Sequence, residues 1–360
     1  MAGNIPLPKA GLAAWHGLGH HQPRTGQSRR YPIMHKQSRE DVMNMHRRSL
    51  LASAGALLAA PALAQPRWPD RPIEIIVGFT AGGGTDLDAR SYAAALEKRL
   101  GASVVVVNRP GAGGEVALAA VARSRPDGHT IGTTNMPGLL TIPIERTAQF
   151  KLDDFIGIGN LVTDPSAITV HEDSPYRTLA DLLAAARARP DTITYASPGV
   201  GTDDHLQLVL LQAATGTRFV HVVFQGDPQL RTAVLGKQVD SMGLNLGPVT
   251  ANPDKLRVLS QGGATRSRFR SDVPTLMELG FPVQMASERG LVMAAGTPPA
   301  IVQRLREATA DIARDPEFVK ILEGRFTEPA YEAGDAWFER LRRQEAEYRR
   351  LWQSTPWSQR

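Results

Sequence analysis

The stretch Gly78-Phe79-Thr80-Ala81-Gly82-Gly83-Gly84-Thr85-Asp86 (GFTAGGGTD) lies where a predicted strand turns into a predicted helix. It follows an apolar, β-branched run at residues 73–77 and precedes a segment at residues 86–100 that is rich in Ala and Leu. Glycines at a strand-to-helix turn let backbone N–H groups lie bare against a bound anion. They serve a tight turn without a ligand equally well. The stretch therefore predicts a strand, a turn and a helix, and leaves two explanations for the turn.

The same alternation continues along the chain. Short β-branched runs, which predict strands, stand at residues 103–107, 130–134, 161–170, 192–196, 219–223, 239–244, 257–259 and 290–294. Helical patterns stand between or after them at residues 116–123, 179–189, 206–215, 230–235, 301–312 and 335–352. Strands that alternate with helices are typical of α/β folds. We therefore predict an α/β fold whose mixed, mostly parallel sheets are flanked by helices.

Local signals set the ends of several helices. Thr85 is the expected N-cap of the first helix, and Gly101 is its expected C-terminal stop. Thr178 and Asp181 form a capping box at a later helix, with Asp in place of the usual Glu. The charged amphipathic helix at residues 335–352 is too short to form its own core, and we expect it to pack back on the body.

An export signal precedes the folded part. Arg47 and Arg48 are followed by an apolar run at residues 50–60 and by the small residues Ala62-Leu63-Ala64, which form a cleavage pattern. The paired arginines resemble a twin-arginine signal. We expect a signal peptide at residues 45–64, cleaved after Ala64, and a disordered or over-extended start at residues 1–44. The mature protein is then residues 65–360.

Removal of the predicted signal peptide and the residues before it changes the net charge of the protein. The chain has 41 Lys and Arg against 36 Asp and Glu, and residues 1–64 hold 8 of the basic and 2 of the acidic residues. The mature part therefore carries 33 against 34, a net charge of −1, which gives no support for nucleic-acid binding. With no Cys in the chain, disulfides, thiol nucleophiles and Cys-ligated zinc are excluded. A length of 296 residues fits two domains.

A second glycine-containing turn lies at residues 197–205 (SPGVGTDDH), again between a predicted strand and a predicted helix. Two such turns, one in each half of the chain, favour a small anionic ligand in a cleft between domains. Asp203 and Asp204 complement the helix dipole, and His205 is expected to be a hydrogen-bonded core histidine. The other histidines lack metal-ligand spacing, so we expect no metal ion and no cofactor.

A hydrolase is the alternative that the same turn allows. Ser197, His205 and one of the two aspartates can be written as a nucleophilic triad. Ser197 is not part of a GxSxG motif, and the histidine follows only eight residues later in the same turn. Binding without chemistry is therefore the preferred interpretation, and the protein is expected not to be an enzyme.

Six stretches along the mature chain, in order, are similar to the tripartite tricarboxylate transporter receptors, the Bug-type periplasmic solute-binding proteins. They are WPDRPIEIIVGFTAGGGTDLDAR, VVVVNRPGAGGEVALAAVARSRPDGHT, ITYASPGVGTDDHLQ, GKQVDSMGLN, SDVPTLMELGF and MAAGTPPAIVQRL. The resemblance implies a two-domain Venus-flytrap fold that closes on a small organic acid, typically a carboxylate. It also implies that backbone amides, hydroxyls and ordered water hold the carboxylate.

Position by position, the resemblance assigns ligand-binding residues to both turns. The assigned residues are Phe79, Thr80, Ala81, Gly83 and Asp86 in the first turn, Ser197, Gly199 and Thr202 in the second, and Asn245. Three departures stand nearby. Gly78 stands where the family usually has a proline. Residues 222–226 stand where the family usually has a run of Val-Pro-Tyr-Lys-Gly type, and Leu244-Asn245 stands in place of Phe-Asp. The second-domain side thereby lacks a lysine and a carboxylate that the family usually has there.

The resemblance implies a domain organisation and a set of partners. Domain 1 is expected to comprise residues 65–165 and 287–360, and domain 2 residues 166–286. The protein is expected to be a periplasmic monomer that delivers its ligand to membrane permease subunits. A ligand sensor for a signalling partner is a further alternative. Backbone donors recognise the carboxylate itself and leave the rest of the ligand to the shape of the pocket.

Overall fold

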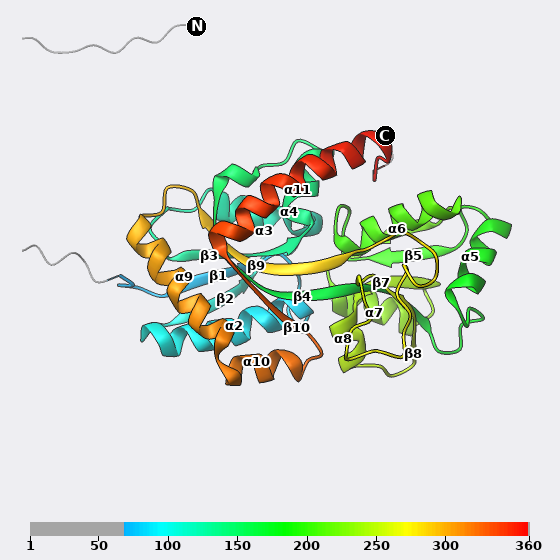
Figure 1. The fold of residues 1–360 in the computed structure, drawn as a ribbon, viewed down its shortest axis with the longest axis horizontal. Helices are drawn as coiled ribbons and strands as arrows, with labels where there is room; N and C mark the ends of the chain where they lie inside the picture. Colours follow the sequence, from blue (N-terminus) through cyan, green and yellow to red (C-terminus); the bar gives the residue numbers. More distant parts are fainter. Residues whose placement is uncertain (1–67, 359–360) are drawn as a thin grey trace, which may run out of the picture. The chain divides into compact units, whose positions relative to one another are not determined.

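A computed structural model describes residues 68–358, in which ten strands form one mixed sheet with helices on both faces (Figure 1). The main path through the sheet has the order β2-β1-β3-β9-β4-β7-β5-β6, and β8 and β10 both pair with β4. The α/β prediction is confirmed. The predicted signal peptide and the residues before it lie outside the described part of the chain.

The first part of the chain builds one half of the sheet. Its elements are β1 (Ile73–Val77), α2 (Gly84–Leu100), β2 (Val104–Asn108), the 3₁₀ turn η1 (Ala112–Gly114), α3 (Glu115–Ala122), β3 (Thr130–Met136), α4 (Gly138–Glu145), η2 (Leu152–Asp154) and β4 (Phe155–His171). β1 is parallel to both β2 and β3, as the helical crossovers require. Gly101 ends α2 in a left-handed conformation, as predicted, and its amide bonds to Glu97.

The middle of the chain builds the other half of the sheet. Its elements are α5 (Leu179–Ala188), β5 (Thr194–Ser197), α6 (Asp203–Thr215), β6 (Val220–Val223), α7 (Asp227–Leu235), β7 (Ser241–Asn245), α8 (Leu246–Ala251) and β8 (Leu256–Gln261). β5 is parallel to both β6 and β7. The capping box predicted at Thr178 and Asp181 is confirmed in both directions.

The last part of the chain returns to the first half of the sheet. Its elements are β9 (Ala286–Ala294), α9 (Pro299–Arg314), α10 (Pro316–Glu323), β10 (Glu328–Ala333) and α11 (Gly334–Ser354). β9 lies between β3 and β4 and is antiparallel to both. Figure 1 shows β9 in yellow and β4 in green side by side through the middle of the sheet.

β4 belongs to both halves of the sheet. As far as Pro165 it pairs with β9, and from Ser166 onward it pairs with β7 and β8. The strands that pair with β4 thus change between Pro165 and Ser166, two adjacent residues of a strand that is 17 residues long. The two halves are therefore joined by continuous backbone rather than by a loose linker.

Separate hydrophobic cores fill the two halves. Around β1, β3 and β9 the cores include Ile75, Leu96 and Leu305, all fully buried. Around β5 and β7 the cores include Tyr195 and Met242, with exposures of 1% and 0%. Burial of each large apolar side chain contributes about 1.5–3 kcal/mol. Each half thus has an apolar interior of its own.

α11 packs on the sheet, as predicted for the C-terminal helix. Trp337 is fully buried, and its ring lies against Gly290 of β9, where a Cβ atom would collide with it. Gly290 therefore makes room for the tryptophan. Within residues 68–358, none of the helices is both long and apolar enough to span a membrane.

The expected N-cap of α2 is wrong by two residues. The helix begins at Gly84, and Gly83 is the cap. The Thr85 hydroxyl exchanges hydrogen bonds with the side-chain amide of Asn135 at the end of β3, with distances of 3.1 and 2.8 Å. Because the hydroxyl has this partner on the neighbouring strand, it does not cap its own helix.

Candidate functional site

The first glycine turn, residues 78–83, is held from inside by Asp86. The Asp86 carboxylate accepts hydrogen bonds from the Gly82 amide, Arg90 Nε and Asn108 Nδ2, each at 2.9 Å. Burial opposes ionisation, but these hydrogen bonds outweigh it and lower the pKa of Asp86 below its ordinary value. The carboxylate is committed to the turn and fixes its shape.

The other predicted residues of the first turn differ in exposure. Phe79 is 9% exposed and lines a pocket, whereas Ala81 is exposed to solvent. Gly83 lies at the start of α2 beside Asp227, whose carboxylate would be 3.0 Å from a Cβ atom at this position. The Thr80 hydroxyl donates to Gln229 Oε1 of α7 at 3.2 Å. The first turn therefore touches the second half of the sheet directly.

The second turn, residues 197–202, is closed by its own side chains. Thr202 is the N-cap of α6: its Oγ1 accepts from the His205 amide and donates to the Gly199 carbonyl at 2.8 Å. The Gly201 amide donates to His205 Nδ1 at 3.1 Å. His205 is 5% exposed, so the prediction of a hydrogen-bonded core histidine is confirmed.

The triad that pairs Ser197 with His205 is wrong. Ser197 Oγ lies 2.6 Å from Nε2 of His221 instead, because the parallel strands β5 and β6 bring these side chains together. His221 also stacks on His205, with ring centroids 4.1 Å apart. Burial lowers the pKa of His205 to about 3 and that of His221 to about 4. Both rings are therefore neutral near pH 7.

The second turn packs against the first half of the sheet. A Cβ atom on Gly199 would lie 2.7 Å from the Cα atom of Gly113 in η1. The Thr141 hydroxyl of α4 donates to the Gly201 carbonyl at 2.6 Å. Only glycine permits the contact at position 199, since any side chain would push the two backbones apart.

A pocket of about 440 Å³, called here the Phe79 pocket, lies between these segments. Its lining comes from both halves of the sheet: Gly78, Phe79, Gly111, Ala112, Gly113, Glu145, Arg146, Pro198, Val200, Val223, Phe224 and Gln225. Sequence reasoning missed Arg146, which lies outside both turns. Its guanidinium pairs with Glu115 at 2.9 Å and with Glu145 at 3.0 Å.

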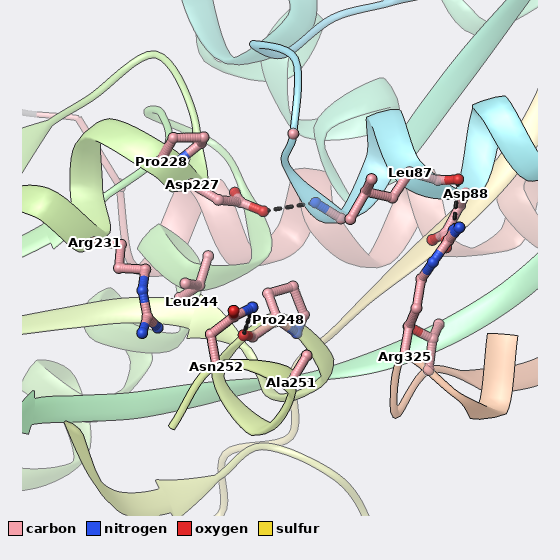
Figure 2. Close-up of a pocket in the computed structure, with 13 residues that line it drawn as sticks. Leu87, Asp88, Asp227, Pro228, Arg231, Leu244, Pro248, Ala251, Asn252 and Arg325 are labelled. Carbon is pink, nitrogen blue, oxygen red and sulfur yellow. Dashed lines mark hydrogen bonds and ion pairs between the residues drawn. The ribbon is translucent and has the colours of Figure 1, made fainter. Parts of the chain in front are cut away.

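A second pocket of about 230 Å³, called here the Arg231 pocket, also has a residue of the first turn, Gly82, in its lining (Figure 2). It is lined by Gly82, Gly84, Leu87, Asp88, Asp227, Pro228, Arg231, Leu244, Pro248, Ala251, Asn252, Arg325 and Thr327. The two pockets have no lining residue in common.

Behind the first turn, Arg289 of β9 joins elements of both halves. This side chain is 4% exposed and donates to Asp88 at 2.8 Å, to Asp164 at 2.9 Å and to Asn245 Oδ1 at 2.9 Å. Burial works against its charge, but the carboxylates of Asp164 and Asp88 outweigh it and raise the pKa of Arg289 above its ordinary value. The cation is thus held charged.

Asn245, the ninth predicted ligand residue, belongs to the same buried network. Its Nδ2 donates to Asp203 Oδ2 at 2.6 Å and to the Asp164 carbonyl at 3.2 Å. Both ends of the side-chain amide therefore have protein partners. Within residues 68–358, no group of three or more His, Asp or Glu side chains is arranged to hold a metal ion.

Comparison with known proteins agrees with this architecture. Residues 89–350 match the model of the TctC family, described as the tripartite tricarboxylate transporter family receptor. The UPF0065 protein in the gbd 5' region of Cupriavidus necator is 36% identical over 300 residues, covering 80% of this chain and 91% of the relative. Protein BugT of Bordetella pertussis is 33% identical over 270 residues, covering 72% and 82%.

Solved structures give the same assignment. The periplasmic binding protein BugD superposes with a TM-score of 0.75 at 28% identity, covering 80% of this chain and 98% of that one. Rpa4515 of R. palustris, solved with adipate, superposes with a TM-score of 0.75 at 27% identity, covering 79% and 97%. The resemblance inferred from the six sequence stretches is confirmed, and the hydrolase alternative is not supported. The chain belongs to the tripartite tricarboxylate transporter receptor family, whose members are periplasmic substrate-binding receptors and not enzymes.

Proposed function

We propose that this protein binds a small organic acid between the two glycine turns and delivers it to a membrane permease of the tripartite tricarboxylate type. The observation that carries the proposal is the placement of the turns. Each lies at the carboxyl end of a strand and the amino end of a helix, and residues of both line the Phe79 pocket. Such helix ends attract anions through free amides and the helix dipole.

Neutral donors suit a receptor that must release its cargo. The proposed site residues are those predicted from the sequence: Phe79, Thr80, Ala81, Gly83, Asp86, Ser197, Gly199, Thr202 and Asn245. Asp86 and Asn245 act by holding the turns in place, in keeping with their hydrogen bonds inside the protein. The remaining residues offer backbone amides and the Phe79 ring, since the Ser197 and Thr202 hydroxyls already bond within the protein. Arg146 lines the same pocket, where its guanidinium is paired with Glu115 and Glu145.

The domain boundaries follow the sheet. Domain 1 is residues 65–165 and 287–360, and domain 2 is residues 166–286. Two observations support this division: β4 changes partners between Pro165 and Ser166, and each half of the sheet has separate hydrophobic cores. Ligand binding shifts an equilibrium between open and closed arrangements of the two domains.

The remaining parts of the proposal concern location and assembly. The signal peptide at residues 45–64 directs export to the periplasm, and cleavage after Ala64 releases the mature protein. That protein works as a monomer and docks in its closed form on permease subunits. The adipate recorded with Rpa4515 supports a carboxylate as the ligand class.

A thermal-shift screen of mono-, di- and aromatic carboxylates tests the proposal. A saturating ligand stabilises the folded state by mass action and is expected to raise the melting temperature by several degrees. Sugars and amines serve as the comparison set. A response confined to sugars or amines, with no acid active, would contradict the proposed ligand class.

A further inference from the structure

The Arg231 pocket is built from parts of both halves of the sheet. The start of α2 supplies Gly82 and Gly84, whereas α7 and α8 supply Arg231 and Pro248. Figure 2 shows the Arg231 side chain extending from α7 past Leu244 toward Asn252. The Phe79 pocket shares none of these lining residues, so the two spaces are treated as separate sites.

Three of the four charged groups that line this pocket have partners in the protein. Asp88 accepts from Arg289 at 2.8 Å, and the Asp227 carboxylate accepts from the Gly84 amide at 2.8 Å. Arg325 donates to the Leu87 carbonyl at 2.6 Å and to the Ser91 hydroxyl at 2.7 Å. These groups are therefore fixed by the fold itself.

Arg231 is the exception. Its Nη1 is shielded from solvent, yet it has no hydrogen-bond partner within residues 68–358. Among the same residues, Arg231 forms no ion pair, and the carboxylate of Asp254 acts on its guanidinium only from beyond ion-pair distance. A guanidinium placed in this way favours an anion, because shielded charges are normally paired and hydrogen-bonded. Arginine also matches a carboxylate with two parallel hydrogen bonds.

We propose that the Arg231 pocket is a second binding site, in which Arg231 holds the carboxylate of a small monocarboxylic acid. The apolar part of the acid lies against Leu244, Pro248 and Ala251. The volume of about 230 Å³ suits a short-chain acid.

The preference for one carboxylate follows from the rest of the lining. Asp88 and Asp227 share the pocket, so a second negative group on the ligand would meet two carboxylates and a single unpaired guanidinium. Hexanoate and adipate have the same carbon chain and differ only in the second carboxylate. They are therefore a matched pair of probes for this site.

Isothermal titration of the mature protein with hexanoate and adipate tests the inference. Hexanoate is expected to bind this site at least about tenfold more tightly than adipate, a difference of about 1.4 kcal/mol. Arg231→Gln removes the anion contact and is expected to weaken hexanoate binding by about tenfold or more. Ala251→Phe fills the pocket without touching a charge and should have the same effect. Arg349→Gln, at an exposed arginine of α11 paired with Glu345, is the control that leaves binding unchanged.

The inference is overturned if hexanoate does not bind, or if both pocket variants bind it as tightly as the unmodified protein. It is also overturned if Arg146→Gln, in the Phe79 pocket, is the only variant to lose hexanoate. Failure of the proposed function gives a different pattern. Carboxylate binding is then insensitive to Gly199→Ala in the second glycine turn, whatever the response to Arg231→Gln.

Discussion

The carboxylate of Asp227 accepts a hydrogen bond of 2.8 Å from the backbone amide of Gly84, across 143 positions of sequence. Gly84 is the first residue of α2, so a side chain of the second half of the sheet lies at the positive end of a helix in the first half. An internal anion thus occupies a place where a ligand carboxylate would also be stabilised.

Asp227→Ser removes this anion. The ligand-free protein is expected to lose about 1–2 kcal/mol of unfolding free energy, measured by urea denaturation, because a charged hydrogen bond at a helix terminus is lost. Hexanoate affinity is expected to rise about threefold to tenfold, since one negative charge leaves the Arg231 pocket. The exposed Asp153 provides the matched control, Asp153→Ser. Equal or weaker hexanoate binding in Asp227→Ser would contradict the expectation.

Gly199→Ala tests the contact between the second turn and η1. The added methyl group would lie 2.7 Å from the Gly113 Cα atom, so the two backbones must separate. We expect carboxylate binding at the turns to weaken by about tenfold, and stability to fall by about 1–3 kcal/mol. Gly138→Ala is the control, because its nearest neighbours would be 3.8 Å away. Isothermal titration measures the carboxylate affinity of both variants, and thermal melting measures their stability. If Gly199→Ala and Gly138→Ala have the same affinity and stability, the second turn is not part of the binding site.

Arg289→Gln breaks the buried network. Asp88 and Asp164 would lose their guanidinium partner inside the protein, which costs about 3–5 kcal/mol in comparable cases. Arg349→Gln breaks an exposed pair with Glu345 and should cost less than about 0.5 kcal/mol. Urea denaturation of the two variants measures the difference. A loss for Arg289→Gln as small as that for Arg349→Gln would show that the network adds nothing to stability.

The two stacked histidines predict a pH dependence. Burial lowers the pKa of His221 to about 4 in the folded state, whereas an unfolded chain titrates near 6.5. Between these values the unfolded state binds more protons, so stability present above pH 6.5 is lost as the pH falls toward 4. His221→Gln is expected to reduce the slope of unfolding free energy against pH by up to about 1.4 kcal/mol per unit. Parallel curves for the two proteins would contradict the assignment.

Local patterns predicted the elements of this fold well. The capping box at Thr178, the glycine stop at Gly101 and the alternation of strands with helices all depend on residues that are close in sequence. The N-cap of α2 was misplaced because Thr85 hydrogen-bonds to Asn135 on a neighbouring strand. That partner depends on the pairing of β1 with β3, which no local pattern contains.

The chemistry around the turns was harder to predict for the same reason. His221 reaches Ser197 only because β5 and β6 are adjacent, and Arg231 lines a pocket only because α7 faces the start of α2. A single histidine or arginine belongs to no local sequence motif, so neither His221 nor Arg231 could be assigned to a site from the sequence. The glycine turns were found because their unusual composition is itself the local signal.

The order of strands has a consequence for how the chain must be completed. β9 lies between β3 and β4, yet residues 286–294 follow almost everything else in the sheet. A truncated product that stops before residue 286 leaves the edges of β3 and β4 bare where β9 would insert. Open edges of this kind recruit other strands and aggregate. A fragment that stops before residue 286 is therefore expected to aggregate rather than to form a smaller working domain.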